Sequence, residues 1–317
     1  MSGEPVGRPC WCGAKTARAK FSATLESGAT FHYVECEGCG VLAEWPQLAG
    51  EELAHYYAAD YYGATRKKFV GPVATLVEYF QGSRARLAAE HLAAGAKILD
   101  VGCGNGGFLV QMKRRGFAVE GTEWTEASAA RIAAEEGIKV HVGDLTSLTL
   151  AATSYDAISL WHVFEHVPAP DATLAAIARL LKPGGVLLLA MPNQESWQSG
   201  LYGQHWFHLD PPRHLFGFGP RSLRKALDQH GFSVLSQSTL SLEQNPYGAL
   251  QSQLNALGFS RERAYETLKG TSKNGAGAKA LDYVMLALLA GPALFFALIE
   301  TAVGRGGTMT LVCRKSG

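Results

Sequence analysis

The chain has 317 residues, with 29 Lys and Arg against 28 Asp and Glu; 47% of the residues are hydrophobic and 18% are charged. Its length is enough for about two domains with a sizeable core, and its charged share, below the usual value of roughly 25%, predicts a surface less polar than average. The charge balance excludes a general nucleic-acid-binding protein, which needs a basic face for phosphates, and the apolar content excludes intrinsic disorder.

Four of the six cysteines form two close pairs near the amino terminus. They are Cys10 with Cys12 and Cys36 with Cys39, and a glycine follows each pair. The residues before them, MSGEPVGRP, lack the apolar core of a signal peptide, so we expect a cytoplasmic protein with reduced thiols. The pattern favours a zinc-ribbon-like lobe with its connector over residues 1–62, holding a structural zinc on four sulfurs. Free thiols, or a redox pair at Cys36 and Cys39, are the alternatives.

A strand that runs into a glycine-rich turn follows at residues 97–107, Lys-Ile-Leu-Asp-Val-Gly-Cys-Gly-Asn-Gly-Gly. Strand, glycine turn and helix together bring backbone amides and a helix amino terminus against a ligand. The acid at the strand end, Asp100, disfavours a pyrophosphate and favours a ligand that carries an amine or ammonium.

Acidic residues also end the next two expected strands. Glu123 is placed to accept hydrogen bonds from ribose hydroxyls, and Asp144 is suited to an adenine amino group. The further strands are expected at 117–123, 139–145, 155–161 and 185–190. Strands that alternate with helices predict an α/β fold with a doubly wound parallel sheet and the ligand across its carboxyl edge.

Five motifs in this order resemble those of the class I S-adenosylmethionine-dependent methyltransferases that act on small molecules, over roughly residues 75–240. The motifs are Asp100-Val-Gly-Cys-Gly-Asn-Gly106, Glu123, Gly143-Asp144, Trp161-His-Val-Phe-Glu-His166-Val-Pro and Leu181-Lys-Pro-Gly-Gly185. The resemblance implies a mostly parallel seven-stranded, Rossmann-like sheet that binds S-adenosylmethionine. The implied cofactor-binding residues are Asp100, Gly102, Gly104 and Gly106 at the amino-acid moiety, Glu123 at the ribose, Trp124, Asp144 and Leu145 at the adenine, and Trp161.

Candidate catalytic residues follow the fourth strand. Methyl transfer from a sulfonium is an in-line displacement that needs alignment, and a base when the acceptor is a hydroxyl. His162 and His166 are one helical turn apart, so both can face the sulfur if a helix starts there, with Glu165 between them. A histidine base suits O-methylation, because its pKa lies near neutrality. A structural role for His166, or a divalent cation on these three residues, is the alternative.

A second polar cluster lies in residues 204–218, which hold three histidines, several aromatics and Pro211-Pro212. This composition fits a loop that contacts the substrate. The resemblance to methyltransferases implies that the acceptor sits beneath this loop, with Arg213 and His214 as its polar contacts. The alternative is a rigid connector that packs aromatic side chains.

An insertion of about 70 residues, 241–307, separates the expected strands 232–238 and 308–314, far more than a hairpin needs. It contains an apolar run, 283–299, which Gly291-Pro292 interrupts. We therefore expect a helical hairpin within residues 281–303, buried in the protein or in a homodimer interface. A peripheral anchor at the inner face of the membrane, or an apolar wall for a lipid-like acceptor, is the alternative.

The sequence thus predicts a methyltransferase domain over 63–317 that methylates a small or amphiphilic, lipid-like acceptor, most readily at oxygen. Methylation at carbon or nitrogen by the same site is one alternative. A NAD-dependent dehydrogenase is another, although it would prefer GxGxxG after the first strand. A non-catalytic, zinc-containing interaction protein is the third.

Overall fold

The computed structural model describes residues 5–7, 10–25, 27–48, 52–53, 56, 72–260, 266–267 and 275–316. They form two compact units. One combines Met1–Tyr57, Pro192–Lys225 and Ser238–Met309, and the other combines Ala58–Met191, Ala226–Gln237 and Thr310–Gly317. The boundary predicted at 62/63 lies outside the described residues, so the division into 1–62 and 63–317 stays a prediction.

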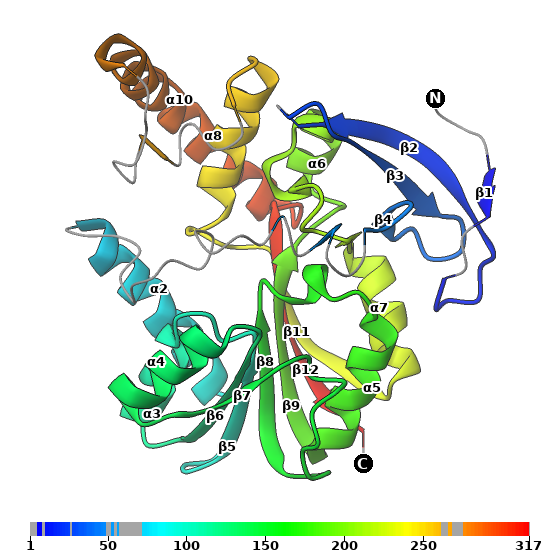
Figure 1. Cartoon of the computed structure of the whole chain (residues 1–317), viewed down its shortest axis with the longest axis vertical. Coiled ribbons are helices and arrows are strands. Elements are labelled where there is room, and N and C mark those ends of the chain that lie inside the picture. The colour runs from blue at the N-terminus through cyan, green and yellow to red at the C-terminus, as the bar shows by residue number, and fades with distance from the viewer. Residues whose placement is uncertain are drawn as a thin grey trace. The chain divides into compact units, whose positions relative to one another are not determined.

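The second unit is built on a seven-stranded sheet of order β11-β12-β9-β8-β5-β6-β7 (Figure 1). Its strands are β5 (Lys97–Val101), β6 (Ala118–Glu123), β7 (Lys139–Val142), β8 (Tyr155–Trp161), β9 (Leu181–Pro192), β11 (Phe232–Ser238) and β12 (Thr308–Lys315). The pairs β5–β6, β6–β7, β5–β8 and β8–β9 are parallel. Strand β12, red in Figure 1, runs the opposite way between β9 and β11. The predicted mostly parallel seven-stranded sheet is confirmed.

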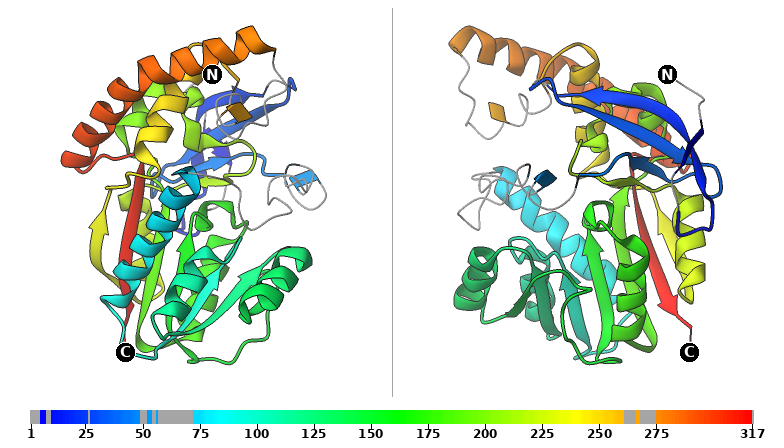
Figure 2. Two further views of the ribbon diagram at one scale, coloured as in Figure 1. Left: turned by 90° about the vertical axis from the view of Figure 1, so that its left-hand side faces the viewer. Right: turned by 45° about the vertical axis from the view of Figure 1, so that its right-hand side comes forward.

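Helices cover both faces of this sheet (Figure 2). They include α2 (Pro72–Ala89), α3 (Gly107–Arg114), α4 (Glu126–Glu136), α5 (Pro170–Leu180) and α7 (Pro220–Gln229). Helix α3 buries Met112, with Phe108 and Leu109 four and three residues before it, against strand residues such as Ile98 and Leu188. This spacing gives the helix one apolar stripe, which fixes its face toward the sheet and holds the preceding glycine turn in place.

The amino-terminal lobe contains an antiparallel sheet of order β1-β2-β3-β4-β10. Its strands are β1 (Pro5–Gly7), β2 (Thr16–Thr24), β3 (Thr30–Cys36), β4 (Leu42–Glu44) and β10 (Phe216–Gly217). Strand β10 belongs to the expected acceptor loop 204–218 but pairs Phe216 with Ala43. The ring of Trp11 stacks on Phe218 at 5.7 Å. This end of the segment is therefore a connector that packs aromatic side chains.

Among the described residues, the first unit also contains the helices α6 (Trp197–Tyr202), α8 (Asn245–Ala256) and α10 (Ala276–Ala302). The predicted break at Gly291-Pro292 is wrong, because α10 runs through Pro292 as one helix of 27 residues. Proline removes one intrahelical hydrogen bond, but the next residue, Ala293, is buried in an apolar cluster with Ala249 and Leu254 of α8. Packing between the helices thus outweighs the local penalty.

The prediction also placed the apolar run 283–299 in the interior of the protein or in a homodimer interface. In the structure of the single chain, most of this run is exposed. Among the described residues, α10 is the one helix long and apolar enough to cross a membrane by length and composition. Only 22% of its most apolar window is buried.

A buried polar cluster holds the carboxyl end of α10. The fully buried Glu300 accepts hydrogen bonds through Oε1 from the Gln198 amide and from the Gly307 N–H, the latter at 3.1 Å. Asn245 Oδ1 accepts bonds from the N–H and hydroxyl of Thr308 at 3.0 and 2.9 Å. These bonds tie α10 to α6 and to Gly307, the residue before β12, and they tie α8 to the first residue of β12.

Replacing Glu300 with glutamine should stabilise the protein at alkaline pH. Burial raises the pKa of Glu300 to about 7. A raised pKa means that the native state binds the proton of Glu300 more tightly than the unfolded state does. The protonated carboxyl therefore contributes its full share to the free energy of unfolding below the unfolded-state pKa, and this contribution is lost as the pH rises toward 7. Because glutamine stays neutral, Glu300→Gln should exceed the wild type by about 1–2 kcal/mol at pH 8 in urea unfolding. The exposed Glu90→Gln is the control, and an equal effect of both variants would contradict the assignment.

Candidate active site

Asp100 lies at the carboxyl end of β5, where the parallel register sets it beside Ser159 of β8. The Ser159 hydroxyl donates to Asp100 Oδ1 at 2.6 Å. Burial raises the pKa of Asp100 to about 7, while this hydrogen bond and the positive charge of Arg84 act in the opposite direction. A ligand ammonium beside the carboxyl would favour its charged form. Ser159 was missed in the sequence, although a serine in the middle of a buried apolar strand was a usable signal.

Three glycines of the turn have positive φ angles: +66° at Gly102, +57° at Gly104 and +77° at Gly106. A Cβ on Gly102 would lie 2.7 Å from Val163 Cγ2, and one on Gly106 would lie 3.2 Å from Ile132. A Cβ on Gly104 would meet no described atom within 4 Å. The outer glycines thus let the turn pack on the protein, while Gly104 borders open space that a ligand can approach.

Alanine at Gly102 should cost more stability than alanine at Gly104. Both substitutions force a side chain into the left-handed region, at about 1–2 kcal/mol, but only Gly102→Ala adds the contact with Val163. We expect a lower melting temperature for Gly102→Ala, with partial recovery when Val163→Ala is added. Equal melting temperatures for the two glycine variants would show that this packing is unimportant.

Glu123 ends β6 and is 2% exposed. Its Oε2 accepts the Gly104 N–H and its Oε1 accepts the Trp124 N–H, both at 2.8 Å. The side chain therefore ties the glycine turn of β5 to the end of β6. A carboxylate offers about four lone-pair positions, so two hydroxyls of a ribose can be bound in addition. The neighbouring Trp124 is 61% exposed and offers an aromatic face to a ligand.

Asp144 follows β7, the strand next to β6. Its Oδ1 accepts the Thr146 N–H at 2.7 Å, and Leu145 beside it is buried. The Gly143 N–H donates to the Glu123 carbonyl at 2.9 Å, which joins the ends of the two strands. The acids predicted at three strand ends therefore lie along one edge of the sheet.

The segment after β8 carries three of the five predicted catalytic residues. A helix starting at His162, the condition under which both histidines would face the sulfur, is not formed; a 3₁₀ turn, Phe164–His166, begins after it. His162 instead has a φ of 57°, a conformation rare outside glycine, and its Nδ1 lies 3.4 Å from Oε1 of the buried Glu165. Trp161, just before, packs on Phe108 with ring centroids 5.4 Å apart.

Arg213 and His214 lie in the other unit. The Arg213 guanidinium donates to both carboxylate oxygens of Asp210, at 2.9 and 2.6 Å. His214 Nδ1 donates to the His208 carbonyl at 2.7 Å. Both side chains thus have structural partners within their own segment, and their contact with an acceptor stays a prediction.

The four amino-terminal cysteines lie together. The Sγ atoms of Cys10 and Cys39 are 3.7 Å apart, those of Cys12 and Cys36 are 3.5 Å apart, and all four lie within 4.8 Å of one another. A tetrahedral zinc with bonds of about 2.3 Å requires sulfur separations of about 3.8 Å. The set therefore fits a closed four-sulfur site.

Both knuckles have the backbone that such a site needs. Gly13 and Gly40 have φ angles of +88° and +78°. Their N–H groups donate to the carbonyls of Cys10 and Cys36, each at 2.9 Å. The hydrogen bond between the thiols of Cys10 and Cys39 lowers the pKa of Cys10 to about 5 and raises the pKa of Cys39.

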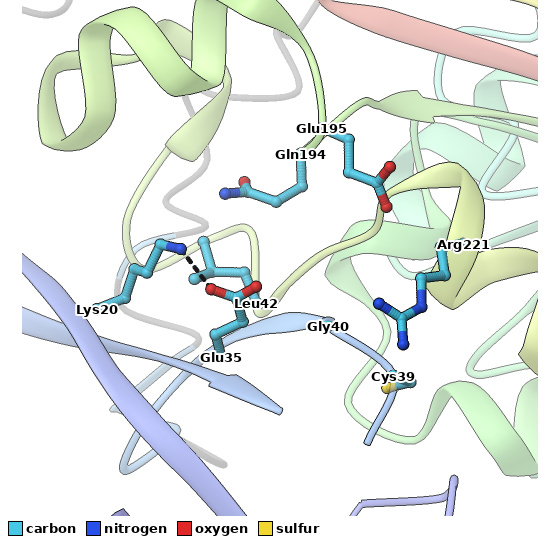
Figure 3. A pocket seen from close by; sticks show the side chains of 8 residues that line it. All are labelled: Lys20, Glu35, Cys39, Gly40, Leu42, Gln194, Glu195 and Arg221. Atoms are coloured by element: carbon cyan, nitrogen blue, oxygen red, sulfur yellow. Dashed lines mark hydrogen bonds and ion pairs between the residues drawn. The ribbon is translucent and has the colours of Figure 1, made fainter. Parts of the chain in front are cut away.

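A pocket of about 330 Å³ lies beside Cys39 (Figure 3). Its lining residues are Lys20, Glu35, Cys39, Gly40, Leu42, Gln194, Glu195 and Arg221. Lys20 and Glu35 form an ion pair on one side of it (Figure 3). None of the predicted cofactor or catalytic residues lines this pocket.

Comparison with known proteins agrees with the fold of the seven-stranded sheet. Solved structures with a similar fold include coclaurine N-methyltransferase bound to N-methylheliamine and SAH (18% identity, TM-score 0.53, covering 86% of this chain and 84% of that one). A putative sarcosine dimethylglycine methyltransferase from Galdieria sulphuraria is also similar (16%, TM-score 0.52, covering 84% and 98%). At this identity they show the fold alone.

Residues 74–237 match the model of the methyltransferase domain family, and the chain belongs to that family. Curated relatives include ubiquinone biosynthesis O-methyltransferases. The one from Nitrosococcus oceani is 39% identical over 107 residues, 32% of this chain and 45% of the relative. The one from Idiomarina loihiensis is 34% identical over 135 residues, 40% and 52%. The chain thus spans about half the length of the relatives it matches.

Proposed function

We propose that this protein transfers a methyl group from S-adenosylmethionine to an oxygen atom of a small or lipid-like acceptor. The observation that carries the proposal is the row of acids Asp100, Glu123 and Asp144 along one sheet edge, with the glycine turn between the first two. This set matches an ammonium, a ribose and an adenine more closely than it matches a pyrophosphate.

Each cofactor-binding residue has a separate task. The Asp100 carboxyl orients the amino-acid moiety, and the backbone at Gly102, Gly104 and Gly106 allows its close approach. Glu123 accepts hydrogen bonds from the ribose hydroxyls. Trp124, Asp144, Leu145 and Trp161 enclose the remainder of the ligand. When bound, S-adenosylmethionine supplies an electrophilic methyl group on a sulfonium.

The protein's own contribution to the chemistry is alignment and proton removal. His162 is the proposed base, with Glu165 at 3.4 Å to stabilise its charged form, and His166 is the second candidate. Arg213 and His214 would contact the acceptor. Transfer to oxygen is favoured because curated relatives are O-methyltransferases. Transfer to carbon or nitrogen would use the same cofactor site.

A structural zinc on Cys10, Cys12, Cys36 and Cys39 completes the proposal. Four sulfur ligands leave no open position, so the zinc stabilises the lobe and takes no part in methyl transfer. We place the enzyme in the cytoplasm, with contact through residues 281–303 either to the inner face of the membrane or to a second copy.

Incubation with methyl-labelled S-adenosylmethionine and a cell extract tests this function. We expect a labelled, oxygen-methylated product that the His162→Ala variant fails to form while it still binds the cofactor. Label on carbon or nitrogen would move the assignment to the alternative acceptors. Cofactor binding without product from any extract would indicate a non-catalytic protein.

A further inference from the structure

Helix α10 is apolar on its exposed side as well as on the side that packs against α8. Its two acidic residues are buried, Asp282 at 3% and Glu300 at 0% exposure. Large apolar side chains on it are exposed: Leu281, Tyr283, Val284, Leu288, Leu294, Phe295, Leu298 and Ile299. A surface helix in water normally buries its apolar stripe and exposes its charges.

The exposed side chains form one continuous face. Leu281, Leu288 and Phe295 recur at seven-residue intervals, so they lie above one another on the helix. Asp282 and Glu300, about five turns apart at 3.6 residues per turn, lie together on the opposite face. The Thr267 hydroxyl holds Asp282 at 3.0 Å, and the Gln198–Gly307 cluster holds Glu300. These buried hydrogen bonds fix the rotation that turns the apolar face outward.

This apolar face continues onto α6. The ring of Trp197, itself 42% exposed, lies 6.4 Å from that of Phe296, and Leu201 on α6 is 65% exposed. Figure 1 shows α10 in orange and red with α8 beside it. At 1.5 Å per residue, α10 alone is about 40 Å long. Contiguous apolar surface of this extent marks an interaction site.

We propose that this apolar face of α10 and α6 rests on an anionic phospholipid membrane, with the helix lying along the surface. Residues 283–299 contain no charged side chain. A dimer of such helices would therefore lack the polar contacts that fix how two copies align along each other. A lipid surface needs no register.

Two further observations favour a lipid surface. Lys279 in the first turn of α10 and Arg305 just after its end lie on either side of the uncharged stretch, and both are cations that anionic headgroups attract. Only residues 303–307 separate α10 from β12, whose Thr308 is bonded to Asn245. The helix is also held near both ends, at Asp282 and at Glu300, and α8 packs against its middle, so it lies along the membrane and does not cross it.

Flotation of the full chain with vesicles tests the proposal. We compare phosphatidylcholine vesicles with vesicles that also contain phosphatidylglycerol. The test variant is Leu288→Gln/Phe295→Gln. The matched control is Leu76→Gln/Leu235→Gln, which removes two exposed apolar side chains, 51% and 45% exposed, from α2 and β11. Circular dichroism shows whether each variant is folded. Titration with S-adenosylmethionine tests the proposed methyl-donor site independently, so a failure of the proposed function is distinguished from a failure to bind lipid.

We expect the wild type and the control to float with the anionic vesicles and the test variant to bind them at least roughly tenfold more weakly. Sedimentation without lipid gives the oligomeric state. A wild type that ignores both vesicle types overturns the proposal. So does a lipid-independent dimer that Leu288→Gln/Phe295→Gln converts to a monomer, which would assign the face to a second copy. Equal loss in the test and control variants also overturns it.

Discussion

Replacing Glu123 with alanine is expected to weaken S-adenosylmethionine binding by roughly 100-fold. Hydrogen bonds to a charged group contribute about 1.5–3 kcal/mol each, and the ribose would lose its acceptor. The substitution also leaves the N–H groups of Gly104 and Trp124 without the carboxylate that they share at 2.8 Å. The glycine turn would then lose its link to β6, so both the ligand contact and its support disappear.

The matched control for this variant is Asp156→Ala. Asp156 belongs to the same sheet, but it lies at the amino end of β8 and pairs with Lys182 at 2.7 Å. Its loss should leave the cofactor affinity unchanged by titration calorimetry. Unchanged affinity in Glu123→Ala, or an equal loss in the control, would remove Glu123 from the cofactor site.

Removing Cys36 and Cys39 together is expected to abolish zinc binding and unfold the amino-terminal sheet. Zinc is worth about 10–16 kcal/mol to isolated zinc-finger peptides, and a segment of this size has only a small core of its own. Metal analysis should give one zinc per wild-type chain and none for Cys36→Ser/Cys39→Ser. Hydrogen exchange should show lost protection in β2 and β3.

Cys313→Ala provides the control, because Cys313 is buried in β12 outside the cysteine cluster. This variant should keep its zinc and the protection of β2 and β3. A metal-free wild type, with the sheet as well protected as in metal-loaded protein, would show that the four cysteines are not a zinc site.

The parallel sheet and its acidic edge were predictable because local pattern decides them. An apolar strand followed by glycines fixes a turn, and parallel strands all end at one edge, so Asp100, Glu123 and Asp144 come together without knowledge of the packing. The cysteine cluster was also predictable from local sequence, since each cysteine pair is followed by a glycine that allows a tight turn.

Features that depend on distant partners were not predictable. Nothing near Phe216 indicates that it pairs with Ala43, and Pro292 locally indicates a break that packing on α8 overrides. The burial of Glu300 needs Gln198, more than 100 residues earlier in the chain. The conformation of His162 was missed because a spacing of four residues suggests a helix whether or not one forms.

Titration calorimetry of the full chain with S-adenosylmethionine and with NAD tests the central claim most directly. We predict saturable binding of S-adenosylmethionine at one site, weakened roughly 100-fold in Glu123→Ala and unchanged in Asp156→Ala, and no binding of NAD. Binding of NAD without S-adenosylmethionine, or of neither, would contradict the assignment of this sheet edge as a methyl-donor site.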